Sequence, residues 1–249
     1  MAVRYDGLTL DWMGYATARI APEDGPIVYT DPGRYGVLTG EWDEEYPHPR
    51  PGDVSPQDGD IVLVTHDHHY DDDGVRRVAD SDATVLVYEA VDPDAIADHS
   101  GRDVAEPEDL PYDVQRVSYG DEVTIEGATI DVIPAYNHPD GRNASNGEPL
   151  HPEGFGCGFV VDVDGHRCFW TGDTDHVEAH DELDVSVFLP SISRSFTINR
   201  EEAAELASVL EPELVLPIHY NTFDALSADS RAFAADVASA GIPVVLDES

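Results

Sequence analysis

The chain of 249 residues carries 52 aspartate and glutamate residues against 13 basic residues, all of them arginine, and its formal net charge is −39. This charge argues against a nucleic-acid substrate, because phosphate recognition needs clusters of lysine and arginine. A hydrophobic fraction of 41% is typical of a globular protein. No apolar run approaches the roughly 20 residues that span a bilayer, and no signal peptide is seen, so we expect a cytoplasmic protein without a membrane partner.

The remaining bulk properties are ordinary. Cys157 and Cys168 are too few for a disulfide framework and are expected to be buried free thiols. There is no internal repeat and no low-complexity linker, so residues 1–249 are predicted to form a single domain.

The acidic residues are spread along the whole chain, which favours adaptation to concentrated salt over an acidic tail or interaction surface. The oligomeric state is not indicated.

Runs of β-branched residues alternate with helical patterns along the chain. Strands are predicted over residues 27–30, 61–65, 84–88, 129–134, 158–163, 167–170, 185–189, 214–218 and 243–246. Helices are predicted over residues 74–79, 94–99, from the capping residue Asn199 to before Pro212, and over 227–240 with Gly241 just beyond. The stretches 31–60 and 136–156 are predicted to be loops long enough to cover a site.

Five of the predicted strands run into side chains that can bind a metal ion. These side chains are Asp31 after 27–30, the histidines from His66 onward after 61–65, His138 after 129–134, Asp173 after 167–170, and His219 after 214–218. Ligands tend to gather at one edge of a sheet, beyond the strand ends. The sequence therefore predicts a convergent cluster.

The chemistry of this set fits one or two divalent ions. His66 and His68 lie two residues apart, so on extended backbone both imidazoles point the same way. Asp71 and Asp173 offer anionic oxygens that can bridge ions, and His219 would close the site from a distant strand. A set of histidines and aspartates without a thiolate suits Zn²⁺, with Mn²⁺ or Fe as alternatives.

The order of several motifs resembles the metallo-β-lactamase superfamily. The matching segments are Trp12-Met13-Gly14-Tyr15-Ala16, Thr30-Asp31-Pro32, Thr65-His66-Asp67-His68, Thr171-Gly172-Asp173-Thr174 and Leu216-Pro217-Ile218-His219-Tyr220-Asn221. Pro134-Ala135-Tyr136-Asn137, followed by His151-Pro152 and Gly154, is similar to a subgroup of small stand-alone members.

The resemblance implies an α+β fold, a four-layer αβ/βα sandwich with metal bound along one edge. Carried over to this chain, His66, His68 and a loop histidine would hold the first ion. His151 fits the subgroup's loop position best, with His138 as the alternative. Asp71 and His219 would hold the second ion, and Asp173 would bridge the two.

The histidine motif departs from the family pattern H-x-H-x-D-H. Read without a gap, Tyr70 takes the place of the aspartate and Asp71 that of the last histidine. With His69 treated as an insertion, Asp71 is the aspartate and Asp72 replaces the histidine. Both registers put Asp71 at the second ion. The family's opening histidine is Tyr15 here, which is interpreted as structural.

Other polar residues near the motifs are given supporting or surface roles. Asp31 is expected to orient a metal-bound imidazole, and His176 is a weaker candidate for such a role. The remaining histidines lie in polar stretches and are expected to be solvated: His48, His99, His166 and His180.

These inferences predict a metal-dependent hydrolase with Asp173 and Asp71 as its catalytic carboxylates. A metal-bound hydroxide would attack a small ester, lactone, amide or phosphodiester, because a bound ion lowers the pKa of its water from ~15.7 towards ~7. Metal-bound water, Asp67 or Asp72 could serve as general acid. The alternatives are a nuclease of the same fold and a non-catalytic member with a degenerate second metal site.

The excess of acidic residues predicts that the folded state depends on salt. Raising the salt concentration from about 0.1 M to about 1 M shortens the screening length from about 10 Å to about 3 Å, which weakens repulsion between neighbouring carboxylates. We expect the melting temperature to rise over this range and bound metal to be lost when salt is dialysed away. A melting temperature that is the same at both salt concentrations would contradict this prediction.

Overall fold

The computed structural model describes residues 2–41 and 52–248, so the predicted surface residue His48 lies outside the described residues. Its first sheet has seven strands whose spatial order equals their order in the chain. They are β1 (Val3–Tyr5), β2 (Leu8–Gly14), β3 (Thr17–Pro22), β4 (Val28–Thr30), β5 (Gly59–Val64), β6 (Ala79–Tyr88) and β7 (Asp113–Val117). The first four strands pair antiparallel, and β4 to β7 run parallel.

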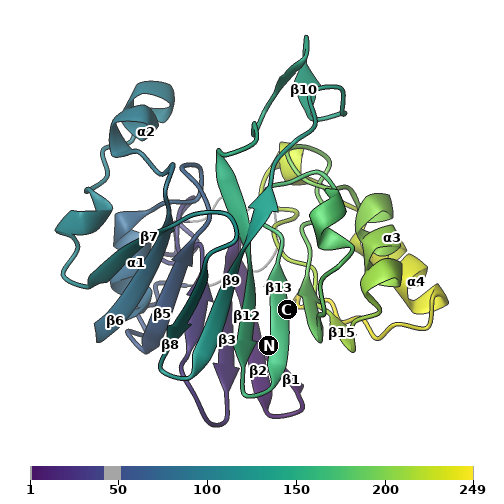
Figure 1. Cartoon of the computed structure of the whole chain (residues 1–249), viewed down its shortest axis with the longest axis horizontal. Coiled ribbons are helices and arrows are strands. Elements are labelled where there is room, and N and C mark those ends of the chain that lie inside the picture. Colours follow the sequence, from purple (N-terminus) through teal and green to yellow (C-terminus); the bar gives the residue numbers. More distant parts are fainter. Residues whose placement is uncertain (1, 42–51, 249) are drawn as a thin grey trace.

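The second sheet has six strands in the order β15-β14-β13-β12-β9-β8. They are β8 (Glu122–Ile125), β9 (Ala128–Ala135), β12 (Gly156–Val163), β13 (His166–Trp170), β14 (Val187–Leu189) and β15 (Leu214–Val215). Strands β13, β14 and β15 run parallel. A small hairpin of β10 (Ala144–Ser145) and β11 (Glu148–Pro149) lies between β9 and β12 in the chain and protrudes from the body of the molecule (Figure 1).

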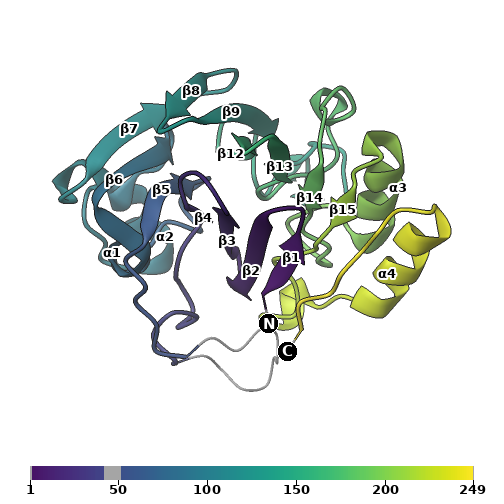
Figure 2. The ribbon, with the colours of Figure 1, turned by 90° about the horizontal axis from the view of Figure 1, so that it is seen from below.

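In the described part of the chain, four α-helices flank the two sheets: α1 (Asp72–Val78), α2 (Pro93–Ser100), α3 (Arg200–Leu210) and α4 (Ser230–Ser239). Figures 1 and 2 show α1 and α2 on one flank of the molecule and α3 and α4 on the opposite flank. Seen from below, β2 to β5 face β9, β12 and β13 (Figure 2). The chain thus forms the expected α+β sandwich. Among the described residues, no helix is long and apolar enough to cross a membrane.

The core lies between the sheets and is built from the hydrophobic runs of their central strands. One continuous cluster of buried apolar side chains includes Val62 of β5 and Phe159 of β12. Strand β5 is buried at nearly every position, as is typical of a parallel strand covered on both faces. In β2, by contrast, fully and partly buried residues alternate, which matches the period of a strand with one face towards the core. Cys157 and Cys168 are buried and free, as predicted.

Most predicted elements are present, with differences where packing overrides local pattern. Residues 243–246 form no strand, and only a bridge from Val244 to Val215 remains. Several observed strands were not predicted: β1, β2, β3, β7, β8, β10 and β11. In β7, for example, the sequence DVQRV has partly exposed polar residues that dilute the apolar signal. The helix at Asn199 has both bonds of the predicted capping box, with Asn199 Oδ1 accepting from the Glu202 N–H.

The expectation that His166 and His180 are solvated is wrong. His166 is 8% exposed, and its Nε2–H donates to the Asp6 carbonyl oxygen at 2.8 Å. His180 is fully buried against the Phe169 ring, and its Nε2–H donates to the Pro134 carbonyl oxygen at 2.9 Å. Its Nδ1 has no hydrogen-bond partner in the described part of the chain. Burial therefore lowers the pKa of His180 to about 4.

The depressed pKa of His180 predicts a pH-dependent contribution to stability. The folded state binds this proton less tightly than the unfolded state, whose histidine pKa is about 6.5, so stability is retained above that pH and lost as the pH falls. We expect His180→Gln to lose less stability than the wild type on acidification. The difference between their free energies of unfolding should change by up to roughly 3 kcal/mol between about pH 7 and pH 4. Parallel pH profiles in urea unfolding at constant salt would contradict this.

Candidate metal centre

The histidine segment is held in a tight turn between β5 and α1. After β5 ends at Val64, the backbone N–H groups of His69 and Tyr70 both donate to the His66 carbonyl oxygen at 3.1 Å. The turn places His66, His68 and His69 on one side of the sheet edge. Arg102 fixes it from outside, with Nη1 donating to the Tyr70 carbonyl and Nη2 to the Asp67 carbonyl.

Three further residues reach this edge from the second sheet. Asp173 follows β13, His219 follows β15, and His151 lies in the loop between β11 and β12. These three side chains and those of His66 and His69 are buried, whereas His68 is partly exposed. Residues far apart in the sequence thus meet beyond the ends of neighbouring strands, as the strand-end pattern predicted.

The first group of potential ligand atoms belongs to His66, His68 and His151, and these atoms all lie within 4.8 Å of one another. His68 Nδ1 is 3.0 Å from His151 Nε2. The Oδ2 atom of Asp173 faces the same group and lies 3.7 Å from both His66 Nε2 and His151 Nε2.

The second group belongs to His69 and His219, whose Nε2 atoms are 3.1 Å apart. The other oxygen of Asp173, Oδ1, is 3.6 Å from each of these nitrogens. The Asp173 carboxylate therefore stands between two groups of histidines and turns one oxygen towards each.

The outer nitrogens of three imidazoles are anchored by the surrounding structure. His69 Nδ1 is 3.0 Å from Asp31 Oδ2, and His151 Nδ1 is 3.2 Å from Asn137 Oδ1. Both partners are acceptors, so these Nδ1 atoms carry the proton and the Nε2 atoms present lone pairs to the centre. His219 Nδ1 lies 3.3 Å from Ser191 Oγ.

The arrangement fits a bound cation. His66 Nε2 and Asp173 Oδ1 are buried and have no hydrogen-bond partner among the described residues, although such atoms are normally paired. A tetrahedral ion with ligands at about 2.1 Å needs ligand atoms roughly 3.4 Å apart. The separations of 3.0 Å between His68 and His151, 3.1 Å between His69 and His219, and 3.6–3.7 Å to the Asp173 oxygens are close to that. The donor set, imidazole nitrogen with carboxylate oxygen, suits a divalent metal.

Burial sets the protonation of the ligands. It lowers the pKa of His68 and His219 to about 3 and that of His151 to about 4. The pKa of His66 and that of His69 are likewise held well below their usual value, first by burial and then by neighbouring histidines. The imidazoles are therefore neutral at pH 7 and need not release protons to bind a metal.

Asp31 is the buried carboxylate that supports this centre. It accepts hydrogen bonds from the Thr65 N–H at 2.8 Å, the Thr65 hydroxyl at 2.9 Å and the Trp170 Nε1–H at 2.8 Å, besides its contact with His69. Burial raises the pKa of Asp31 to about 7, although the bonds from Thr65 and Trp170 lower it. Its expected role, to orient an imidazole, agrees with this geometry.

Unusual backbone conformations are concentrated around the centre. Tyr15, Asp31 and His219 have φ values of 50°, 40° and 57°, in the left-handed region that non-glycine residues rarely adopt. The Tyr15 carbonyl oxygen accepts from both the His219 N–H and the Trp12 Nε1–H. At Gly172, a Cβ atom would lie 2.2 Å from the Cys157 carbonyl oxygen, so only glycine allows β12 to approach Asp173 this closely.

The structure does not bring every predicted ligand into the cluster. The Asp71 carboxylate caps α1, where it accepts from the Gly74 N–H at 3.3 Å, and it also accepts from the backbone N–H of Arg34. His138 Nε2 is bonded to the His176 carbonyl oxygen at 2.9 Å and lies outside both ligand groups. His69, which one of the two registers treats as an insertion, is the side chain that lies beside His219 and Asp173, where Asp71 was expected.

The residues considered as general acids or outer partners also have other roles. Asp67 accepts from the Asp92 N–H at 2.8 Å, and Asp72 lies in the first turn of α1. His176 is exposed, and its Nε2 lies 2.7 Å from Asp181 Oδ1. The repeated histidine in His68-His69 was the one sequence signal that could have identified the missing ligand.

A pocket of about 230 Å³ opens beside the cluster. Two of its lining residues, His219 and Asp173, belong to the second ligand group. Aromatic and apolar side chains make up half of its wall. Arg34 is the arginine among the described residues that line it. The lining residues are Tyr15, Arg34, Tyr35, His68, His99, Asp173, Phe196, His219, Phe223 and Leu226.

Comparisons with known proteins agree with the fold and the motifs. The family model of the beta-lactamase superfamily domain matches residues 9–219. A UPF0173 metal-dependent hydrolase from Pelotomaculum thermopropionicum is 31% identical over 189 residues, covering 73% of this chain and 75% of the relative. One from Methanopyrus kandleri is 28% identical over 95% of this chain and 94% of the relative.

A solved structure of a metallo hydrolase from Ignicoccus hospitalis has a TM-score of 0.65 at 22% identity and covers 97% of this chain and 95% of its own. At this identity the likeness concerns the fold alone. Together with the family match over most of the length and the order of the motifs, it shows that this chain belongs to the metallo-β-lactamase superfamily.

Proposed function

We propose that the protein is a metal-dependent hydrolase that holds two divalent ions. His66, His68 and His151 would bind one ion, His69 and His219 the other, and Asp173 would bridge them. The observation that supports this most directly is the Asp173 carboxylate, which faces two separate histidine groups with one oxygen each. The names of the relatives, metal-dependent hydrolases, agree with this reading.

Zinc is the metal we propose, with manganese or iron as alternatives, because the donors are imidazole and carboxylate without a thiolate. When bound, such ions lower the pKa of a coordinated water and polarise the bond under attack. The chain itself supplies fixed lone pairs, since Asp31 and Asn137 orient two of the imidazoles from behind. Preoriented ligands need little rearrangement on metal binding.

The substrate class we propose is a small ester, lactone, amide or phosphodiester, hydrolysed in the cytoplasm. The pocket of about 230 Å³ is smaller than the roughly 300–1,000 Å³ typical of drug-sized ligands. Its apolar and aromatic wall excludes water from part of the substrate and leaves the face towards Asp173 polar. A compact substrate with one hydrolysable bond fits this shape.

Asp173→Ala and His66→Ala test the proposal. We expect each to lose bound metal by elemental analysis and to lower kcat/KM on generic esters, lactones and phosphodiesters by more than about 100-fold. His176→Ala is a matched control, because it removes a histidine near the same edge that lies outside both ligand groups. Full metal content and unchanged turnover in both site variants would rule this centre out.

The second ligand group predicts opposite results for two neighbouring residues. His69→Ala should reduce bound metal by about one ion per chain, because its Nε2 faces His219 and Asp173. Asp71→Ala should keep its metal and instead lower the free energy of unfolding by about 1 kcal/mol, because it removes the N-cap of α1. Loss of metal from Asp71→Ala with full metal in His69→Ala would reverse the assignment.

A further inference from the structure

The guanidinium groups of two arginines beside the metal centre, Arg34 and Arg102, donate to backbone carbonyls and not to a carboxylate within the described part of the chain. Arg34 Nη1 donates to the His68 carbonyl oxygen, and Arg102 donates to the Asp67 and Tyr70 carbonyls. Within the described ranges, neither guanidinium forms an ion pair with an acidic side chain. Elsewhere in this acidic chain, arginines commonly have such partners: Arg19, Arg76, Arg77, Arg116, Arg142, Arg167 and Arg200.

The guanidinium of Arg34 lines the pocket and is only partly committed. It lies over the Tyr35 ring, with its Cζ 4.6 Å from the ring centroid, and is half-buried. A guanidinium has five N–H donors, and the bond to His68 uses one of them. The others form a planar fork that matches a carboxylate or a phosphate group.

The rest of the pocket lining is poor in negative charge. Among the described residues that line the pocket, Asp173 is the one carboxylate, although about a fifth of the chain is acidic. Phe196, Phe223 and Leu226 provide an apolar wall, and His99 stands near His68 with ring centroids 5.4 Å apart. The pocket thus combines one available cation, an apolar wall and the metal ligands.

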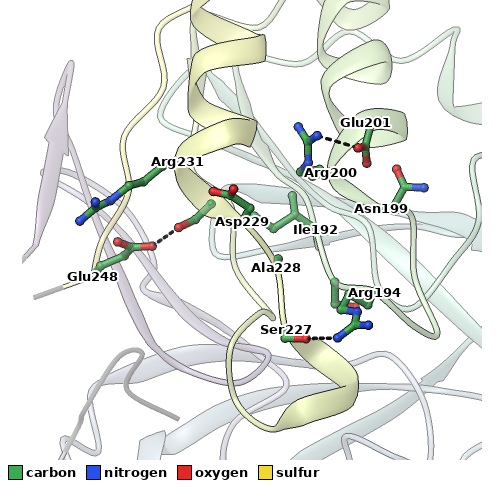
Figure 3. A pocket seen from close by; sticks show the side chains of 12 residues that line it. Ile192, Arg194, Asn199, Arg200, Glu201, Ser227, Ala228, Asp229, Arg231 and Glu248 are labelled. Carbon is green, nitrogen blue, oxygen red and sulfur yellow. Dashed lines mark hydrogen bonds and ion pairs between the residues drawn. The ribbon is translucent and has the colours of Figure 1, made fainter.

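A larger cavity elsewhere in the described part of the chain lacks this imbalance. It measures about 600 Å³, lies beside the N-terminal ends of α3 and α4, and is lined by three arginines and three acidic residues. Figure 3 shows Arg200 turned towards Glu201 and Arg194 bonded to Ser227. Its charges balance within the cavity, so it does not select an anion.

We propose that the pocket beside the metal centre selects substrates that carry an anionic group, a carboxylate or a phosphate, and that Arg34 is its specificity-determining residue. The apolar part of the substrate contacts Phe196, Phe223 and Leu226, and the bond to be cleaved lies towards Asp173. This inference rests on the proposed hydrolase function for the role of the site, and it adds the class of compound that enters.

The electrostatics of the whole chain make this selection meaningful. A net charge of −39 repels anions from most of the surface, so an anionic substrate needs a local positive group to enter. Arg34 provides it at the pocket wall, and Arg102, which follows α2 and donates to the Asp67 and Tyr70 carbonyls, adds positive charge nearby. An anion placed against Arg34 also relieves the repulsion between these two guanidiniums.

Binding of three non-hydrolysable probes to the metal-loaded protein tests the proposal by calorimetry at constant salt. The probes are phenylbutyrate, phenylpropylphosphonate and the neutral phenylbutanol. We expect Arg34→Gln to weaken the binding of at least one acid by about tenfold or more and that of phenylbutanol by less than about twofold. Arg34→Lys should recover part of the loss, since it keeps the charge but not the fork.

Arg231→Gln is the matched control, because it removes the same charge from an exposed position on α4, away from this pocket. Bound metal is measured in every variant. If Arg34→Gln binds less metal than the wild type, its probe affinities are compared with those of wild-type protein from which the metal has been removed with a chelator. Both proteins then lack metal, and a remaining difference in affinity is due to Arg34. The acid whose affinity falls in Arg34→Gln indicates the substrate: phenylbutyrate indicates a carboxylate, and phenylpropylphosphonate indicates a phosphate.

Equal affinities of wild type and Arg34→Gln for both acids would overturn the inference, because the metal alone would then hold the anion. Tighter binding of phenylbutanol than of both acids to the wild type would overturn it too. Selectivity that depends on Arg34 in a protein without hydrolytic activity would support the inference and contradict the hydrolase proposal. Hydrolytic activity without selectivity that depends on Arg34 would support the hydrolase proposal and contradict the inference about Arg34.

Discussion

The buried carboxylate of Asp31 is the contact on which the site depends. It follows β4 in the first sheet, accepts from Thr65 at the end of β5, and accepts from Trp170 at the end of β13 in the second sheet. The same side chain orients His69. One carboxylate therefore joins the two sheets and aims a ligand, and its left-handed backbone is a strain that these four contacts hold in place.

Much of the fold follows from local signals in the sequence. The central strands β5, β12 and β13 contain short apolar runs, and the helix after Asn199 begins with a capping box. Each of these elements can therefore be predicted from the sequence alone. The edge strands β7 and β8 cannot be, because their stability comes from pairing with β6 and β9 and not from their own composition. Burial of His180 likewise depends on Phe169 and Pro134, which lie far from it in the sequence.

The proposed ligand set shows which site residues the sequence motifs can identify and which they cannot. His66, His68, His151, Asp173 and His219 follow from strand ends and family order, but the choice between Asp71 and His69 depends on where the turn stops. The chain enters α1 directly after Tyr70, and the free N–H groups of that first turn need a cap. Asp71 supplies this cap, so its carboxylate is not free to bind a metal. The tight turn at the His66 carbonyl instead places His69 in the centre.

The distribution of charge links stability to the site. Acidic side chains dominate the surface, and many of the arginines are used to offset them locally through ion pairs. At the centre the pattern reverses, because five histidines lie around the Asp173 carboxylate, and Arg34 and Arg102 donate to backbone carbonyls of the histidine loop. Desolvation lowers the pKa of the buried imidazoles and keeps them neutral. A guanidinium is not deprotonated in proteins, so the arginines are the positive charges nearest this centre. They bind backbone carbonyls of the histidine loop, which fixes the ligands in place while leaving the charge free to act on whatever enters the pocket.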